Sequence, residues 1–137
     1  MEIDSKELII LFTKLNNVID GFDEVFLIKN NNLTIKDKIL IFLNEKPQTP
    51  YELIKKLGLA KSNLALITKD LINEEKIIKT QDSFDKRNIK YIITEKGNNY
   101  IQKVLKLIDN NINKQLKYTK NAEKINQLTK TLNDVLN

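Results

Sequence analysis

The side chains in this chain that are best suited to chemistry are cationic and polar groups in two short stretches. Ammonium and guanidinium groups pair with phosphates, and amide or hydroxyl groups can bond base edges. Cationic and polar side chains gathered in two short stretches therefore point to binding of a polyanion. In "KSNLALITK" the residues concerned are Lys61, Ser62, Asn63 and Lys69, with the apolar Leu66 among them, and in "DKRNIK" they are Lys86, Arg87 and Lys90.

Arg87 is the only arginine in a chain with 22 lysines. Its guanidinium is planar and less strongly hydrated than an ammonium, so it enters a narrow, A·T-rich minor groove at a lower desolvation cost. Asp85 can hold it by a charge-assisted hydrogen bond. Lys86 and Lys90 would then meet phosphates. The alternative is a surface ion pair that only stabilises a turn and contributes little.

Cysteine and histidine are both absent, which excludes disulfides, thiolate chemistry and histidine-based catalysis. A metal site would have to rest on carboxylates alone, which is rare for zinc. The three glycines, Gly21, Gly58 and Gly97, lie too far apart to form a phosphate-binding loop. We therefore expect no enzyme, no metal and no cofactor.

The net charge of +5 is unevenly distributed. Residues 1–45 carry a net charge of −3, and residues 46–96 and 97–137 each carry +4. The middle of the chain is thus the part expected to meet a polyanion. A solvated surface on a lysine-rich protein is the alternative explanation.

A length of 137 residues with 41% hydrophobic residues suits one domain with helical extensions. No apolar run reaches the roughly 18 residues of a membrane helix. The acidic start "MEIDSKELII" lacks the basic segment of a secretion signal, so we expect a cytoplasmic protein without a membrane partner.

Capping residues and apolar periodicity define the expected helices. Apolar spacing predicts a long helix over 5–28, followed by a polar break. Thr34 and Asp37 form a capping box that opens a helix ending before Pro47.

A second capping box, Thr49 with Glu52, opens a short helix that Gly58 ends in a left-handed conformation. A helix over 61–73 follows closely, with Leu64, Ile67 and Leu71 toward the core. Two helices joined by a tight turn are typical of a helix-turn-helix.

The periodicity then changes to that of a hairpin. Residues 76–81 and 88–94 are β-branched, and the polar segment 82–88 between them predicts the loop of a two-stranded wing.

Helical periodicity returns over 97–137, and the apolar stripes of the terminal helices exceed what the small middle section can cover. We expect a homodimer in which these helices interlock; the alternative is an intrachain helical bundle. The expected dimerisation residues are Leu8, Leu11, Leu15, Ile125, Leu128 and Leu132.

The chain resembles the MarR family of winged helix-turn-helix transcriptional regulators over essentially its full length. The wing carries the most specific match. In it a D-x-R pattern is followed, after a gap of five residues, by an apolar-Thr-x-x-Gly pattern. The residues that form the match are Asp85, Arg87, Ile93, Thr94 and Gly97.

The resemblance implies a mainly α-helical fold with a small β-hairpin, in which a winged helix-turn-helix is flanked by N- and C-terminal dimerisation helices. Residues 1–137 would form a single domain, with a DNA-binding lobe over 33–96 and a helical dimerisation region over 1–30 and 97–137. Where the family commonly has a glycine before the first wing strand, this chain has Glu74, Glu75 and Lys76, so we expect a turn one residue longer.

By this resemblance the chain would be a sequence-specific DNA-binding regulator and a homodimer on a pseudo-palindromic A·T-rich operator. A repressor is the expected kind of regulator, although the sequence does not separate repression from activation. Helix 61–73 would lie in the major groove and wing 82–88 in the minor groove. Asn63 could read adenine and Leu66 a thymine methyl, while Lys61 and Lys69 would meet phosphates. Asn63 could instead be an ordinary residue of a solvated surface, since the chain is rich in asparagine. Leu66 could belong to the core.

The sequence leaves two further points open: whether the macromolecular partner is DNA or an acidic protein, and whether there is a small-molecule effector. A winged-helix module that binds an acidic protein, without direct DNA binding, would show the same charge pattern. A small-molecule effector of unknown identity would need a pocket, to which Phe12, Phe22, Tyr51 and Tyr100 could contribute, although core positions suit these residues better.

Overall fold

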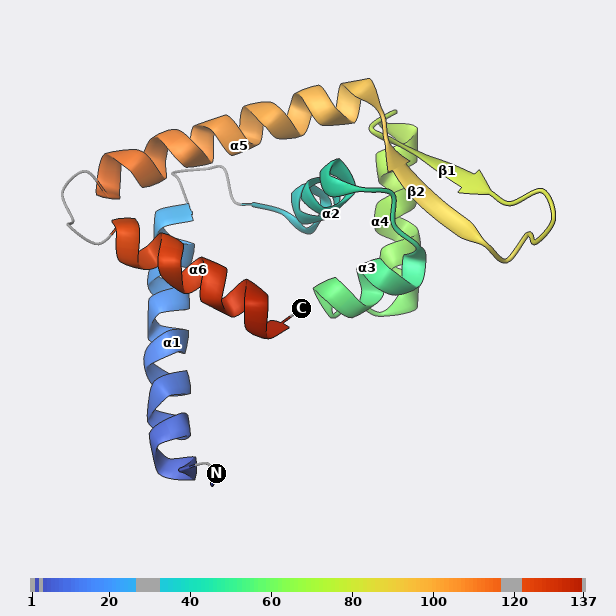
Figure 1. The fold of residues 1–137 in the computed structure, drawn as a ribbon. Helices are drawn as coiled ribbons and strands as arrows, with labels where there is room; N and C mark the ends of the chain where they lie inside the picture. The colour runs from blue at the N-terminus through green and yellow to red at the C-terminus, as the bar shows by residue number, and fades with distance from the viewer. Residues whose placement is uncertain (1, 3, 27–32, 117–121, 137) are drawn as a thin grey trace. The chain divides into compact units, whose positions relative to one another are not determined.

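The order of helices and strands is the one that the sequence predicts (Figure 1). The computed structural model describes residues 2, 4–26, 33–116 and 122–136. Within them the elements are α1 (Ser5–Phe26), α2 (Ile35–Glu45), α3 (Pro50–Leu57), α4 (Lys61–Asn73), β1 (Ile77–Gln81), β2 (Ile89–Ile93), α5 (Glu95–Leu116) and α6 (Ala122–Leu136). The expected fold class, mainly α with one hairpin, is confirmed.

The chain divides into two compact units, residues 33–106 and residues 1–32 with 107–137. We call the first unit the lobe; it holds α2, α3, α4, the hairpin and the first half of α5. The DNA-binding role predicted for 33–96 and the dimerisation role predicted for 1–30 and 97–137 stay predictions. Of the helices that the structure describes, none is long and apolar enough to cross a membrane.

Local capping residues set where α2 and α3 begin. The Thr34 hydroxyl accepts from the Asp37 amide at 3.2 Å, and the Asp37 carboxylate accepts from the Thr34 amide at 2.9 Å, which completes the expected capping box. Thr49 accepts from the Glu52 amide at 3.1 Å, but the return bond expected from the Glu52 side chain is not formed. Gly58 ends α3 at φ 63°, as predicted.

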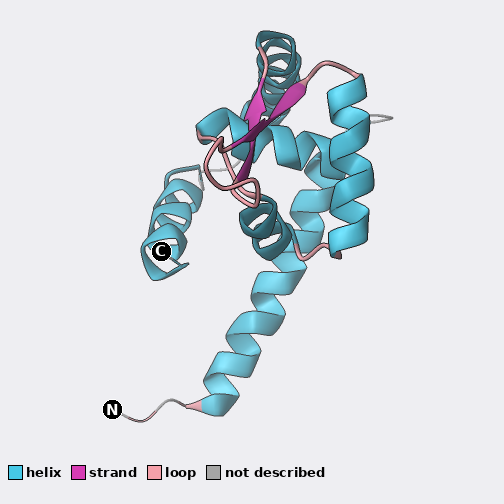
Figure 2. Cartoon of the chain, turned by 90° about the vertical axis from the view of Figure 1, so that its right-hand side faces the viewer, coloured by secondary structure: helices cyan, strands magenta, loops and turns pink. Residues whose placement is uncertain are grey.

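The hairpin is antiparallel, with Ile77 opposite Ile93 and Gln81 opposite Ile89 (Figure 2). Each strand is slightly shorter than the predicted 76–81 and 88–94. An isolated bridge joins Gln48 to Tyr91, whose amides and carbonyls bond at 3.2 and 2.8 Å. This bridge ties the chain between α2 and α3 to the hairpin, a contact that the sequence did not reveal.

The lobe has a core to which every one of its helices and both strands contribute. Nine buried apolar side chains form it, and their burial fixes which face of each helix is left to solvent. They are Ile39, Leu40, Leu43, Leu53, Leu64, Leu71, Ile77, Tyr91 and Ile101.

The turn between α4 and β1 has the hydrogen bonds of a Schellman motif. The Lys76 amide donates to the Leu71 carbonyl at 3.0 Å, and the Glu75 amide donates to the Ile72 carbonyl at 2.9 Å. Glu75 occupies the left-handed position at φ 60°, where glycine is usual. The turn therefore closes without the extra residue that the sequence led us to expect, because Glu75 itself takes the strained conformation.

The first turn of α5 packs directly on this turn. Thr94 caps α5: its hydroxyl accepts from the Gly97 amide at 3.1 Å and donates to the Glu75 carbonyl at 2.6 Å. Gly97 is buried, and a Cβ on it would overlap the Lys76 carbonyl oxygen. The Thr-x-x-Gly pattern thus allows a helix to approach a backbone turn more closely than a side chain would permit.

We expect Gly97→Ala to lower the free energy of unfolding by about 1–3 kcal/mol, because the added methyl group meets a backbone carbonyl that cannot move aside. Urea unfolding followed by circular dichroism at fixed protein concentration measures it. Asn99→Ala, an exposed change in the same helix, is the control and should stay within about 0.5 kcal/mol of the wild type. Equal stability of the glycine and alanine forms would contradict the close approach.

Glu75→Gly should have the opposite effect. A left-handed conformation costs a residue with a Cβ about 1–2 kcal/mol, and the larger entropy of unfolded glycine offsets part of the gain, so we expect stabilisation by about 0.5–1 kcal/mol. Glu75→Ala keeps the Cβ and should bring no such gain. Stabilisation by alanine as large as that by glycine would show that backbone strain is not the cause.

Candidate nucleic-acid interface

Helix α4 has one buried and one solvent-facing side. Leu64, Thr68 and Leu71 are at most 2% exposed, and Ile67 packs against the core. Leu66 is 65% exposed, so the alternative that it belongs to the core does not hold in this chain. All five residues of α4 that the sequence proposed as a binding surface are exposed; they are Lys61, Ser62, Asn63, Leu66 and Lys69.

Thr68 helps to hold α4 in this orientation. Its hydroxyl donates to the Leu64 carbonyl at 2.8 Å and lies 3.3 Å from the Tyr91 hydroxyl on β2. Because both groups are buried, these bonds satisfy polar atoms that burial would otherwise destabilise. The sequence analysis missed Thr68, although its spacing of four residues from Leu64 places it on the buried side.

Gln48 is a second buried polar residue that the sequence analysis missed. Its side-chain amide donates to the Phe42 carbonyl at 2.9 Å and accepts from the Lys56 ammonium at 2.7 Å. The side chain therefore connects the end of α2 to α3 while its backbone pairs with β2. It fixes the short helix that precedes α4.

Hydrogen bonds within the wing loop, residues 82–88, define its conformation. The Asp82 amide donates to the Asn88 carbonyl at 3.1 Å, and the Asn88 amide donates to the Asp85 carbonyl at 2.9 Å. The Asp82 carboxylate also accepts from the Phe84 amide at 2.9 Å. The loop thus has a defined shape although its side chains are exposed.

Arg87 lies in this loop with its side chain 92% exposed. The Asp85 carboxylate accepts from the Arg87 backbone amide at 3.0 Å and from its Nε at 3.2 Å. The bond expected from the D-x-R spacing is therefore present, and it leaves the terminal nitrogens of the guanidinium toward solvent. Lys86 and, on β2, Lys90 are exposed as well.

Phe84, in the same loop, is 98% exposed. The sequence analysis did not single it out, yet an aromatic residue inside "DSFDKR" was a visible signal, since nothing apolar lies beside it.

An ion-pair network joins the end of α4 to α2. The Lys36 ammonium lies 2.8 Å from a Glu74 carboxylate oxygen and 3.7 Å from Asp70, and Lys76 lies 3.1 Å from Glu74. Bonds from Lys36 and then Lys76 hold the pKa of Glu74 below its usual value, and Glu74 in turn raises the pKa of Lys36. The network thus ties the α4–β1 turn to α2 through Lys36.

Tyr100 of α5 adds a contact to the same region. Its hydroxyl donates to the Asp37 carboxylate at 2.9 Å, and the Lys76 ammonium lies 3.8 Å from the centre of its ring. Partial burial, together with the Asp37 and Glu74 carboxylates, raises the pKa of Tyr100 to about 12. Asp37 therefore both caps α2 and anchors α5.

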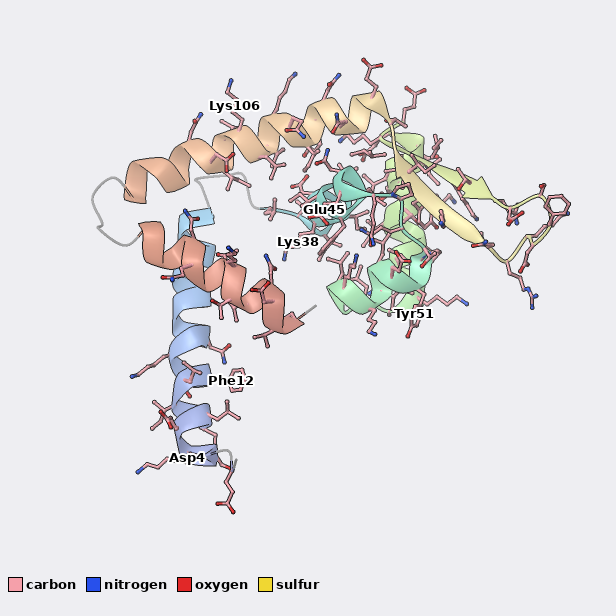
Figure 3. All side chains as sticks on the ribbon, viewed as in Figure 1. Asp4, Phe12, Lys38, Glu45, Tyr51 and Lys106 are labelled. Carbon is pink, nitrogen blue, oxygen red and sulfur yellow. The ribbon has the colours of Figure 1, made fainter. Side chains whose placement is uncertain are left out.

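Of the aromatic residues considered for an effector pocket, the structure describes the side chains of Phe12, Tyr51 and Tyr100. Phe12 and Tyr51 are 54% and 70% exposed and project from α1 and α3 (Figure 3). Phe22 lies outside the described side chains. Tyr100 lines an open hollow of about 500 Å³ in the lobe, together with Lys76, Glu95, Lys96, Asn99 and Lys103.

The predicted dimerisation residues are described only in part. Leu8 and Leu11 of α1 are 40% and 58% exposed, and Leu132 of α6 is half-buried. Leu15, Ile125 and Leu128 lie on helical backbone, but their side chains fall outside the described ones. In the part of the chain that the structure describes, no group of acidic side chains could hold a metal ion.

We expect Glu74→Gln to lower the free energy of unfolding by about 0.5–1 kcal/mol at pH 7, a small value because the carboxylate is partly exposed. Because folding lowers the pKa of Glu74, its contribution is present above pH 4.5 and is lost as the pH falls through the lowered pKa. The difference between variant and wild type should therefore vanish in acid. A difference that persists unchanged below the lowered pKa would exclude the ion pairs as its cause.

Comparisons with known proteins agree with this architecture. No protein-family model matches the chain, and no curated protein matches it in sequence. Among solved structures, the regulator BldR from Sulfolobus solfataricus is 20% identical with a TM-score of 0.73, each chain covered to 98%.

Two further structures have the same fold. Wild-type MarR from E. coli is 19% identical with a TM-score of 0.64, covering 100% of this chain and 99% of its own. A MarR-family regulator from Rhodococcus sp. RHA1 is 14% identical with a TM-score of 0.66, covering 98% and 97%. The chain therefore has, over nearly its whole length, the winged-helix fold of the MarR-family transcriptional regulators.

Proposed function

We propose that this protein is a sequence-specific DNA-binding transcriptional regulator. Helix α4 inserts into the major groove of duplex DNA, and the wing loop, residues 82–88, reaches the adjacent minor groove. The observation that carries the proposal is the division of α4: its polar, cationic side is exposed while the opposite side is packed into the lobe.

The side chains on α4 suit the two kinds of contact that a DNA reader makes. Lys61 and Lys69 pair with phosphates and set the position of the helix, while Asn63 bonds the N6 and N7 edge of adenine. Leu66, which is exposed, contacts a thymine methyl group.

The wing supplies contacts on the other groove. Asp85 orients Arg87 while leaving most of its guanidinium in solvent, so the group reaches a narrow minor groove already oriented. Lys86 and Lys90 contact the flanking phosphates. The preference for A·T-rich sequence follows from the narrowness and negative potential of such grooves.

A homodimer is the expected active form. The first turns of α1 expose a run of apolar side chains, Leu8 to Phe12, each 40–65% exposed in the isolated chain. Val135 and Leu136 of α6 are 74% and 79% exposed. A second copy that covers these surfaces would present two α4 helices to half-sites about 34–36 Å apart on a pseudo-palindrome.

Regulation follows from this arrangement. We infer a repressor, located in the cytoplasm, whose hold on DNA depends on the spacing of the two lobes. An effector would act by changing that spacing, and cysteine oxidation cannot do so because the chain has no cysteine. That the protein is not an enzyme stays a prediction from the sequence.

Arg87→Ala and Arg87→Lys together test the wing. Both should weaken binding to A·T-rich duplex, but only alanine should flatten the dependence of affinity on salt, by roughly one unit of slope per wing, because lysine keeps the charge. Fluorescence anisotropy between about 50 and 200 mM salt measures affinity and slope. Lys103→Ala, an exposed change on α5, controls for the general effect of charge.

Tight binding by Arg87→Ala with an unchanged salt slope would remove the wing from the interface. Failure of the intact dimer to bind any duplex from a random pool at low salt would contradict the proposed function and favour the protein-interaction module.

A further inference from the structure

The Phe84 ring is left almost entirely uncovered by the part of the chain that the structure describes. At 98%, its exposure is the highest among the large apolar side chains that the structure describes. Leaving a phenylalanine in water forgoes the stabilisation that its burial would bring. A polar residue at the same place would be more favourable for the isolated protein.

The backbone around Phe84 is fixed rather than loose. The Asp82 carboxylate accepts from the Phe84 amide at 2.9 Å. Just beyond Phe84, the Asp85 carboxylate accepts from the Arg87 amide. The Gln81 side-chain amide donates to the Lys86 carbonyl, which closes the loop from its other side. The ring is therefore presented from a preorganised turn, and its insertion into a ligand would cost little ordering of the backbone.

The neighbours of Phe84 indicate what the ring meets. Lys86 and Arg87 follow it closely and are exposed, whereas the Asp82 and Asp85 carboxylates accept bonds from within the loop, from the Phe84 amide and from Arg87. A partner that meets the ring therefore meets cationic donors beside it. Among polyanions, stacked duplex DNA offers both: phosphates for the cations, and base faces for an apolar side chain. An acidic protein surface offers the charge but no stack into which a ring can insert.

We propose that Phe84 is a wedge that enters a base step in the minor groove, partly unstacks it and bends the DNA. The inference rests on the proposed function, since it requires that the wing reach the minor groove. Arg87 then holds the groove beside the step that Phe84 opens. The wing in this chain thus reads deformability in addition to groove width.

The wedge predicts sequence preference at positions that form no hydrogen bond with the protein. Unstacking is least costly at pyrimidine–purine steps such as TA, and most costly within stiff A-tracts. The selected operator should therefore carry a flexible step under each wing. A duplex with an A-tract there would remain A·T-rich but bind less well.

The experiment uses the full-length protein and a duplex of about 30 bp, with dyes at both ends, carrying the sequence that the protein selects from a random pool. Wild-type protein should bring the ends together by a bend within about 20–90° and make thymines at the wing steps reactive to permanganate, which attacks unstacked thymine. Phe84→Ala should abolish both effects and lower affinity roughly tenfold per wing, because each wing loses one stacking contact.

Phe84→Leu is the matched control: it keeps an apolar wedge and should retain most of the bend. Because the ring is exposed, neither change should alter thermal unfolding. The salt slope should stay that of the wild type in both variants, unlike in Arg87→Ala.

Wild-type affinity, bending and permanganate reactivity in Phe84→Ala would overturn the wedge while leaving the DNA-binding proposal intact. Equal losses in Phe84→Ala and Phe84→Leu would also overturn it. Absence of duplex binding by the wild-type protein would overturn both proposals together.

Discussion

The arrangement of the lobe depends on the close approach of the first turn of α5 to the turn that ends α4. Gly97 lies beneath the Lys76 carbonyl with no room for a Cβ, and the Thr94 hydroxyl bonds to the Glu75 carbonyl. The Thr94 amide also donates to the Lys76 carbonyl at 3.0 Å. Helix α4, the hairpin and α5 are thereby joined largely through backbone atoms, which sequence changes at the surface do not alter.

This junction decides what the lobe can present to a partner. With α4 fixed at its end by Glu75 and along its length by Leu64, Thr68 and Leu71, its cationic side has only one orientation, toward solvent. Only three residues separate α4 from the hairpin, so the wing is placed by the same turn. A major-groove helix and a minor-groove loop need such a fixed relation, since an error of one residue would misplace every base contact.

Local features could be predicted from the sequence, and long-range polar contacts could not. The capping residues Thr34 and Asp37 and the left-handed Gly58 act within a few residues, so their roles follow from spacing alone. The Gln48–Tyr91 bridge and the Tyr100–Asp37 bond join residues 43 and 63 positions apart, and no local pattern marks them. The exposure of Leu66 likewise depends on which side of α4 the lobe covers.

Methylation protection is the most direct test of the central claim that α4 and the wing occupy adjacent grooves. Dimethyl sulfate attacks guanine N7 in the major groove and adenine N3 in the minor groove, so one reagent reports on both. On the selected duplex, guanines in two half-sites one helical turn apart should be protected at N7, and flanking adenines at N3. Full occupancy of the duplex with N7 still reactive in both half-sites would contradict the account.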